Sequence, residues 1–176
     1  GEQMETLIRK NVFETNSSST HSLTVANKPD YSTLFPNKNG ELRFANPPGF
    51  GWSWDTYDDP TSKAWYLYLY LRDWENGGAN CPYDKYDKTK DARSQFTDGA
   101  LEKLELLEKV IKDQTGADFI IWDDKADEKH YTSLEGYIDH QSVECGLNGD
   151  VEFTEQSLKD FVFGIGSIIE TGNDNE

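Results

Sequence analysis

Residues 59–78, DPTSKAWYLYLYLRDWENGG, decide the fold, because they can form either a central helix or a strand. Asp59-Pro60 is a signal for a helix start, with a capping carboxylate before a proline at the first helical position. The alternating WYLYLYL also fits a strand. The cap, the length and the glycine pair at the end favour the helix, and its apolar side chains cover most of its circumference. We therefore expect this helix to lie at the centre of the molecule.

Helical and strand patterns follow on either side of this segment. Asp98 caps a second helix, whose leucines form one apolar stripe up to Gly116, and Thr154 caps a short helix over 155–163. Residues 117–124, ADFIIWDD, predict a buried strand in the sheet on which the second helix packs. Other strands are predicted at 7–14, 22–26, 41–45, 137–140, 167–170 and, after an Asn148-Gly149 hairpin signal, 151–153. This order predicts an α+β fold with a mixed or mainly antiparallel sheet and two or three helices packed on one face.

Length and composition predict one soluble domain. A chain of 176 residues is long enough to form one core. Residues 1–3 precede Met4, the only methionine, and resemble the remnant of a cleaved expression tag, so we expect the domain to span 4–176. Residues 80–97 alternate charges and tyrosines without an apolar period, which predicts an exposed excursion. No apolar run reaches the roughly 18 to 20 residues of a membrane span, so we expect a cytoplasmic protein that does not contact a membrane.

The strongest compositional signal is the negative charge. The chain has 33 acidic and 17 basic residues, which gives a formal net charge of −16. A field of this sign repels phosphate backbones and favours cationic surfaces, so we expect no direct nucleic-acid binding. Acidity also serves solubility alone. Aromatic residues make up 13% of the chain and can supply large buried areas, which excludes a disordered acidic segment.

The stretch TNSSSTHS, residues 15–22, gathers hydroxyl side chains around one histidine. Ser17, Ser18 or Ser19 with His21 as a base supply the residue types of a hydrolase or phosphoesterase, to which Asp139 and His140 would contribute. The stretch lacks a glycine-flanked nucleophile elbow, and it has neither the glycines nor the lysine of a P-loop.

Several other interpretations of these residues stay open. Consecutive backbone N–H groups and hydroxyls can bind an anion. His21, Asp139, His140 and Asp174 are metal-ligand types, but adjacent residues on a strand point to opposite faces. A polar turn that satisfies its own hydrogen bonds is the simplest interpretation. We expect no metal, no cofactor and no catalytic centre.

Tryptophans and carboxylates at two places in the sequence are candidates for partner binding. The segment NPPGFGWSWDTYDD contains Trp52 and Trp54, which either pack on the core or meet a partner. None of the acidic clusters has the spacing of a calcium loop. Carboxylates spread over a surface can instead occupy a cationic groove built for nucleic acid, although they are also typical of a solvated face. The candidate partner-binding residues are Trp52, Trp54, Asp55, Asp58, Asp59, Asp84, Asp87 and Asp91.

The motifs RKNVFETNSSSTHSL, GYIDHQS and TGNDN resemble small proteins from bacteriophages and mobile elements of Gram-positive bacteria, over most of the chain. Such genes are similar to anti-CRISPR and other anti-defence genes in their genetic setting. Some type II anti-CRISPR proteins are also of this size and acidity. The resemblance implies a phage-encoded inhibitor that acts in a bacterial host cell on a defence nuclease such as Cas9. The alternative is a small phosphoesterase or nucleotide-binding protein that uses the Ser/His stretch with Asp139 and His140.

Overall fold

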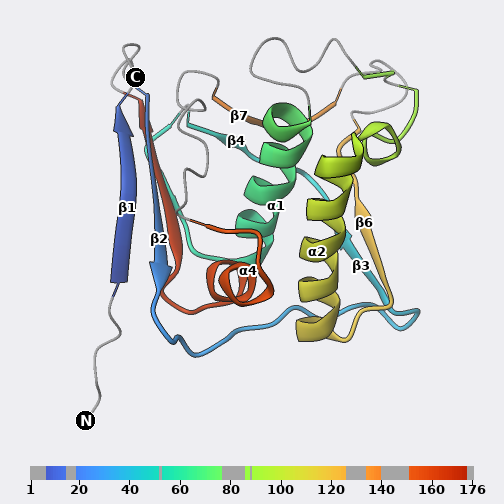
Figure 1. The fold of residues 1–176 in the computed structure, drawn as a ribbon, viewed down its shortest axis with the longest axis horizontal. Helices are drawn as coiled ribbons and strands as arrows, with labels where there is room; N and C mark the ends of the chain where they lie inside the picture. Colours follow the sequence, from blue (N-terminus) through green and yellow to red (C-terminus); the bar gives the residue numbers. More distant parts are fainter. Residues whose placement is uncertain are drawn as a thin grey trace.

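The computed structural model describes residues 7–14, 19–51, 53–76, 86–87, 89–125, 134–139 and 151–173, and only the backbone of 7–14, 19–21 and 173. The predicted α+β fold class is confirmed (Figure 1). Its strands form three sheets, however, where the sequence predicted one. None of the helices in the described ranges has the length and apolar character that crossing a membrane requires.

The largest sheet has four antiparallel strands and is built from both ends of the described chain. Its order is β1 (Leu7–Glu14), β2 (Ser19–Ala26), β8 (Ile168–Asn173) and β5 (Asp55–Tyr57). The last strand in sequence therefore lies between β2 and β5. Leu23 of β2 and Ile169 of β8 lie opposite each other and are both buried, which identifies the face that meets the helices.

The helices form a layer beside this sheet. The helix α1 (Pro60–Tyr70) has seven consecutive buried residues, Lys63 to Leu69, which confirms the prediction that it is central. The short α4 (Glu155–Val162) contacts both α1 and β2, and α2 (Asp98–Thr115) packs on α4 from the other side (Figure 1). A capping residue fixes the start of α1: the Asp59 carboxylate accepts a hydrogen bond from the Ser62 amide at 2.8 Å. Thr97, and not the predicted Asp98, caps α2.

Two small parallel sheets complete the fold. One pairs β3 (Glu41–Phe44) with β6 (Phe119–Trp122), and lies beyond α2 in Figure 1. The other pairs β4 (Gly49–Phe50) with β7 (Tyr137–Ile138). A short 3₁₀ turn, η3 (Arg93–Gln95), precedes α2. The helices thus lie between the four-stranded sheet and the β3–β6 pair.

Three sequence predictions require correction. Residues 151–153 form no strand, and Phe119, predicted to be buried, is 62% exposed because β6 presents that side to solvent. The excursion at 80–97 is not exposed throughout, because Tyr86, Ala92 and Phe96 are buried in the core. The residues of this excursion at 80–85 and 88 lie outside the described ranges, as does the predicted Asn148-Gly149 turn.

Stacked aromatic rings join α1 to β3 and β6. The Trp122 ring lies between Phe44 and Tyr68, with ring centroids 4.5 and 4.7 Å away and nearly parallel planes. Trp65 meets the edge of this stack at 5.4 Å from Trp122. Offset stacking and edge contacts are the favoured geometries of aromatic pairs. The aromatic residues that made the helix ambiguous in the sequence therefore form the contact between the helix layer and the β3–β6 sheet.

A buried ion group lies where α1 passes into the π-helical turn η1 (Leu71–Glu75). Arg72 is fully buried and binds Asp73 at 2.6 and 2.9 Å and Asp124, just after β6, at 3.2 Å. Its remaining N–H groups donate to the carbonyl oxygens of Glu135 and Gly136, each at 2.8 Å. Tyr68 also donates to Asp124, at 2.9 Å. Arg72 thus joins three segments that are distant in sequence.

Replacing Arg72 by methionine should destabilise the protein strongly, because Asp124 would lose its buried cationic partner. We expect the free energy of unfolding to fall by about 3 to 5 kcal/mol, measured by urea denaturation. The exposed pair Arg43–Asp123, 2.6 Å apart, is the matched control, and Arg43→Met should cost about 1 kcal/mol or less. Equal costs for the two variants would contradict this account.

Lys63 is a second buried cation, in the first turns of α1. Its Nζ donates to the carbonyl oxygens of Ser167, at 2.8 Å, and Gly164, at 3.3 Å. Burial lowers the pKa of Lys63 to about 8, although the nearby Asp58 and Asp59 carboxylates oppose this shift. The charged amine therefore stabilises the fold less than its contacts alone would suggest.

The low pKa of Lys63 predicts a specific dependence of stability on pH. Between pH 8 and the ordinary lysine pKa, 10.5, the unfolded chain binds more protons at this residue than the folded chain, so this residue's contribution to stability rises with pH. From about pH 8 to pH 10, we expect the stability of the wild type to rise by about 2 kcal/mol relative to Lys63→Met. The comparison cancels tyrosine ionisation, and exposed Lys112→Met should follow the wild type. A constant difference would refute the prediction.

Candidate partner-binding surface

Trp54 and three carboxylates lie in and directly beside β5, an edge strand of the four-stranded sheet. Trp54 is 61% exposed, and Asp55, Asp58 and Asp59 are also exposed. Among the described residues, none of these three carboxylates forms an ion pair, whereas many other acidic groups of the protein do. No described strand pairs with the outer side of β5. We call Trp54, Asp55, Asp58 and Asp59 the β5-edge surface.

The Trp54 ring lies against a glycine of the neighbouring strand. A Cβ added at Gly172 would lie 2.4 Å from the ring, so the ring occupies the space that a side chain would fill. The Thr171 hydroxyl donates to the Ser53 carbonyl at 2.8 Å, which fixes the backbone before Trp54. Strand glycines often mark such close approaches. One face of the exposed Trp54 ring therefore packs on Gly172 of β8, and the hydrogen bond at Ser53 fixes the backbone that carries the ring.

Tyr57 connects the β5-edge surface to the core. Its ring packs edge-on against Phe50 at 4.8 Å, and Phe50 in turn packs against Tyr66 of α1 at 5.1 Å. Burial, with a smaller effect of the Asp55 carboxylate, raises the pKa of Tyr57 to about 12, so its hydroxyl keeps its proton at neutral pH. The surface thus has a rigid base, which limits the side-chain entropy lost on binding.

The Ser/His stretch lies at the same end of the sheet as Trp54. Ser17 and Ser18 are outside the described residues, and Ser19 and His21 are described as backbone of β2. The register places Ser19 opposite Asn173 and His21 opposite Thr171, and it places Gly172 under Trp54. The described part of the Ser/His stretch therefore pairs with one edge of β8, and the strand that follows Trp54 pairs with the other edge. A catalytic role of the serines and His21 stays the alternative hypothesis.

Of the pair Asp139 and His140, the structure describes Asp139. Asp139 is buried and follows β7, and its amide donates to the Phe50 carbonyl at 2.8 Å. His140 and Asp174 lie outside the described residues. Within the described ranges, no group of three or more histidine, cysteine, aspartate or glutamate side chains has the geometry of a metal site.

Two of the remaining candidate carboxylates, Asp87 and Asp91, each lie near a lysine. Asp87 lies 3.7 Å from Lys90 and accepts from Thr89, and Asp91 lies 3.9 Å from Lys125. Each is thus partly neutralised. Trp52 and Asp84 are outside the described residues.

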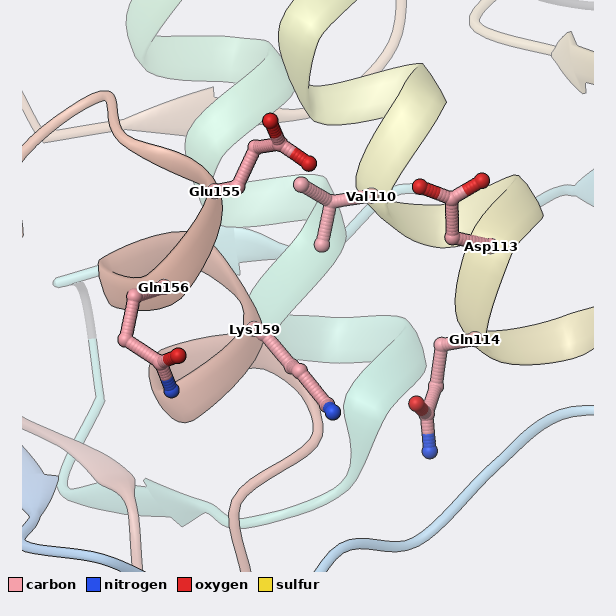
Figure 2. Close-up of a pocket in the computed structure, with 6 residues that line it drawn as sticks. All are labelled: Val110, Asp113, Gln114, Glu155, Gln156 and Lys159. Atoms are coloured by element: carbon pink, nitrogen blue, oxygen red, sulfur yellow. The ribbon is translucent and has the colours of Figure 1, made fainter.

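A groove of about 260 Å³ runs between α2 and α4 (Figure 2). Lys109 lies 2.9 Å from both Asp113 and Glu155 and bridges its two sides. Lys159 lies over the Tyr31 ring at 4.2 Å. These contacts engage most of the polar groups around the groove with neighbouring residues. We therefore assign the groove to the packing of α2 on α4. The lining residues are Val110, Asp113, Gln114, Glu155, Gln156 and Lys159.

Sequence reasoning missed two determinants of this region. Gly172 seats Trp54, but a glycine near the end of a strand gives no sign of which ring it meets. Lys63 comes before the WYLYLYL run of α1 and is buried, and no local pattern in the sequence indicates that a lysine there has no contact with solvent. No protein-family model, curated protein or solved structure matches the chain. The site is therefore interpreted from its own geometry.

Replacing Gly172 by alanine tests the seat of Trp54. The added Cβ would overlap the ring, so the ring must move, and we expect the free energy of unfolding to fall by about 1 to 3 kcal/mol with a changed near-ultraviolet circular dichroism. In a Trp54→Ala background the same change should cost much less, because the overlap is gone. An equal cost in both backgrounds would show that the contact is absent.

Proposed function

We propose that the chain is an acidic inhibitor that binds a cationic, nucleic-acid-handling surface of a bacterial defence nuclease. The observation that carries this proposal is the β5-edge surface, where Trp54 is exposed beside three carboxylates without ion-pair partners in the described structure. An exposed tryptophan on a rigid base can supply the desolvated centre of an interface. The surrounding carboxylates would supply its charged rim.

The carboxylates alone support a second explanation, which Trp54 argues against. Charged side chains on an edge strand also prevent pairing with other sheets. That function needs no exposed aromatic ring, and a tryptophan at 61% exposure works against it by adding apolar surface. The combination of ring and carboxylates therefore favours a partner over simple edge protection.

The net charge of −16 fits the electrostatics of such a partner. A protein that binds DNA or RNA presents lysines and arginines along a groove, and an acidic surface can occupy that groove in place of phosphates. Competition with nucleic acid would follow from this mode of binding. The motifs that resemble phage and mobile-element proteins make Cas9 the first nuclease to test.

Binding to purified Cas9, with and without guide RNA, tests the proposal directly. We expect binding that weakens as salt rises, because the rim charges act through a screened field. Isothermal titration calorimetry at low and high salt would measure the affinity, and DNA cleavage would report inhibition. Absence of binding in both Cas9 states would exclude this nuclease as the target.

Variants of the β5-edge surface locate the interface. Asp55→Asn, Asp58→Asn and Asp59→Asn together should weaken binding by about tenfold, since each exposed charge contributes about 0.5 kcal/mol. Asparagine still caps α1 at position 59. Trp54→Ala should weaken binding by about 30-fold or more, as for an interface hot spot.

Matched controls remove the same charge and the same aromatic area elsewhere. Asp30→Asn, Glu102→Gln and Glu105→Gln neutralise three exposed carboxylates away from β5, and Phe35→Ala removes a ring that is 84% exposed. Both controls should bind more tightly than the corresponding β5-edge variants. If the control triple weakens binding as much as the β5-edge triple, net charge rather than this surface carries the interaction.

A further inference from the structure

The strand β6 has one edge without a partner strand in the described structure. Asp123 and Phe119 donate their amides to the Phe44 and Gly40 carbonyls, at 2.8 and 3.1 Å, so these residues face β3. Backbone groups alternate along a strand, and therefore those of Ile120 and Trp122 point to the opposite edge. There, within the described residues, no hydrogen bond is formed by either backbone amide.

The chain begins to cover this edge and then leaves it. Lys125 pairs antiparallel with Leu134, and the Glu135 amide donates to the Asp124 carbonyl at 2.6 Å. The backbone then turns at Gly136, whose φ of 79° is a conformation that glycine adopts readily, and pairs with β4 instead. Arg72 holds this turn through the Glu135 and Gly136 carbonyls. The open edge is thus maintained by the buried ion group.

A cavity of about 150 Å³ lies beside the open edge. Tyr68 and Trp122 line it, and its wall is the segment from Asp91 to Arg93, where η3 begins. Glu108 of α2 fixes this wall to the strand, because it binds Arg93 at 2.8 and 3.2 Å and the Trp122 indole N–H at 2.9 Å. The volume is that of about one side chain, which is too small for a complete strand.

Asp124 lines the cavity with an oxygen atom that accepts no bond in the described structure. Its residue is 3% exposed, and both Tyr68 and Arg72 donate to the same atom, Oδ2. Oδ1 therefore keeps its acceptor capacity. Among the residues that the structure describes, Arg72 is the one cation that binds both Asp73 and Asp124, so this group carries more negative than positive charge, and a second cation at Oδ1 would form a charge-assisted hydrogen bond.

We propose that the open edge of β6 binds an extended peptide segment of another protein, which places one arginine or lysine side chain in the cavity beside Asp124. The peptide backbone would pair antiparallel with Ile120 and Trp122, along the line that Leu134 already begins. Main-chain hydrogen bonds supply affinity in this mode of recognition, and the side-chain cavity supplies specificity. The proposal does not depend on the β5-edge surface or on the identity of the nuclease.

A blocked pentapeptide, acetyl-Thr-Val-Arg-Val-Thr-amide, is the probe for this site. Titration into ¹⁵N-labelled full-length protein should shift the backbone amides of Ile120 and Trp122 and slow their hydrogen exchange. Replacing the arginine of the peptide by citrulline, which has nearly the same shape without the charge, should weaken binding at least tenfold. The peptide methylated on the amide nitrogens that face β6 should not bind, whereas methylation of the alternate nitrogens should leave binding intact.

Two protein variants test the cavity separately from folding. Asp124→Asn should weaken binding of the arginine peptide and leave binding of the citrulline peptide unchanged. Thermal unfolding of the variant checks that it is folded. Ala92→Leu fills the cavity without changing the charge and should also abolish the preference for arginine. The proposal is overturned if the Ile120 and Trp122 amides do not respond at millimolar peptide, or if both peptides bind the wild type equally.

Discussion

The fold depends on satisfying one guanidinium group that has no contact with solvent. Arg72 has five N–H donors, and all five are used: three on the carboxylates of Asp73 and Asp124, and two on the carbonyls of Glu135 and Gly136. A buried charge with a missing partner costs several kcal/mol, so none of these segments can leave without destabilising the others. The acceptors come from η1, from the residues after β6 and from the segment before β7. One side chain therefore determines how the helix layer meets both parallel sheets.

The π-helical turn places this side chain. The Asn76 amide donates to the Leu71 carbonyl at 2.9 Å, five residues earlier, so the turn is wider than an α-helical one. Such turns are rare and are often found where a helix must present a side chain in a special direction. Here the direction leads to the end of β6, and the resulting turn at Gly136 leaves the edge of that strand open. The ion group that stabilises the fold thus also shapes the cavity beside Asp124.

Local signals in the sequence predicted the helices well, whereas long-range pairing was not predictable. The caps at Asp59 and Thr154 and the stop at Gly116 depend on neighbouring residues only, and the structure confirms them. The parallel pairing of β3 with β6 depends on contacts across about 80 residues, and no local pattern encodes it. The burial of Phe96 within a charged segment is equally non-local. In the candidate site, the exposure of Trp54 was an open alternative, because a tryptophan after glycines fits the core as well as the surface.

The position of β8 between β2 and β5 has a consequence for how the chain folds during synthesis. The strand β8 (Ile168–Asn173) is synthesised after both β2 and β5, and until it emerges the edges of these two strands that face it have no partner. Pairing over such a long sequence separation is slow, because the entropy of closing the loop is lost before the contacts form. The nascent chain therefore stays open in its largest sheet until β8 has been synthesised, and its acidic character helps to keep that unfinished state from aggregating.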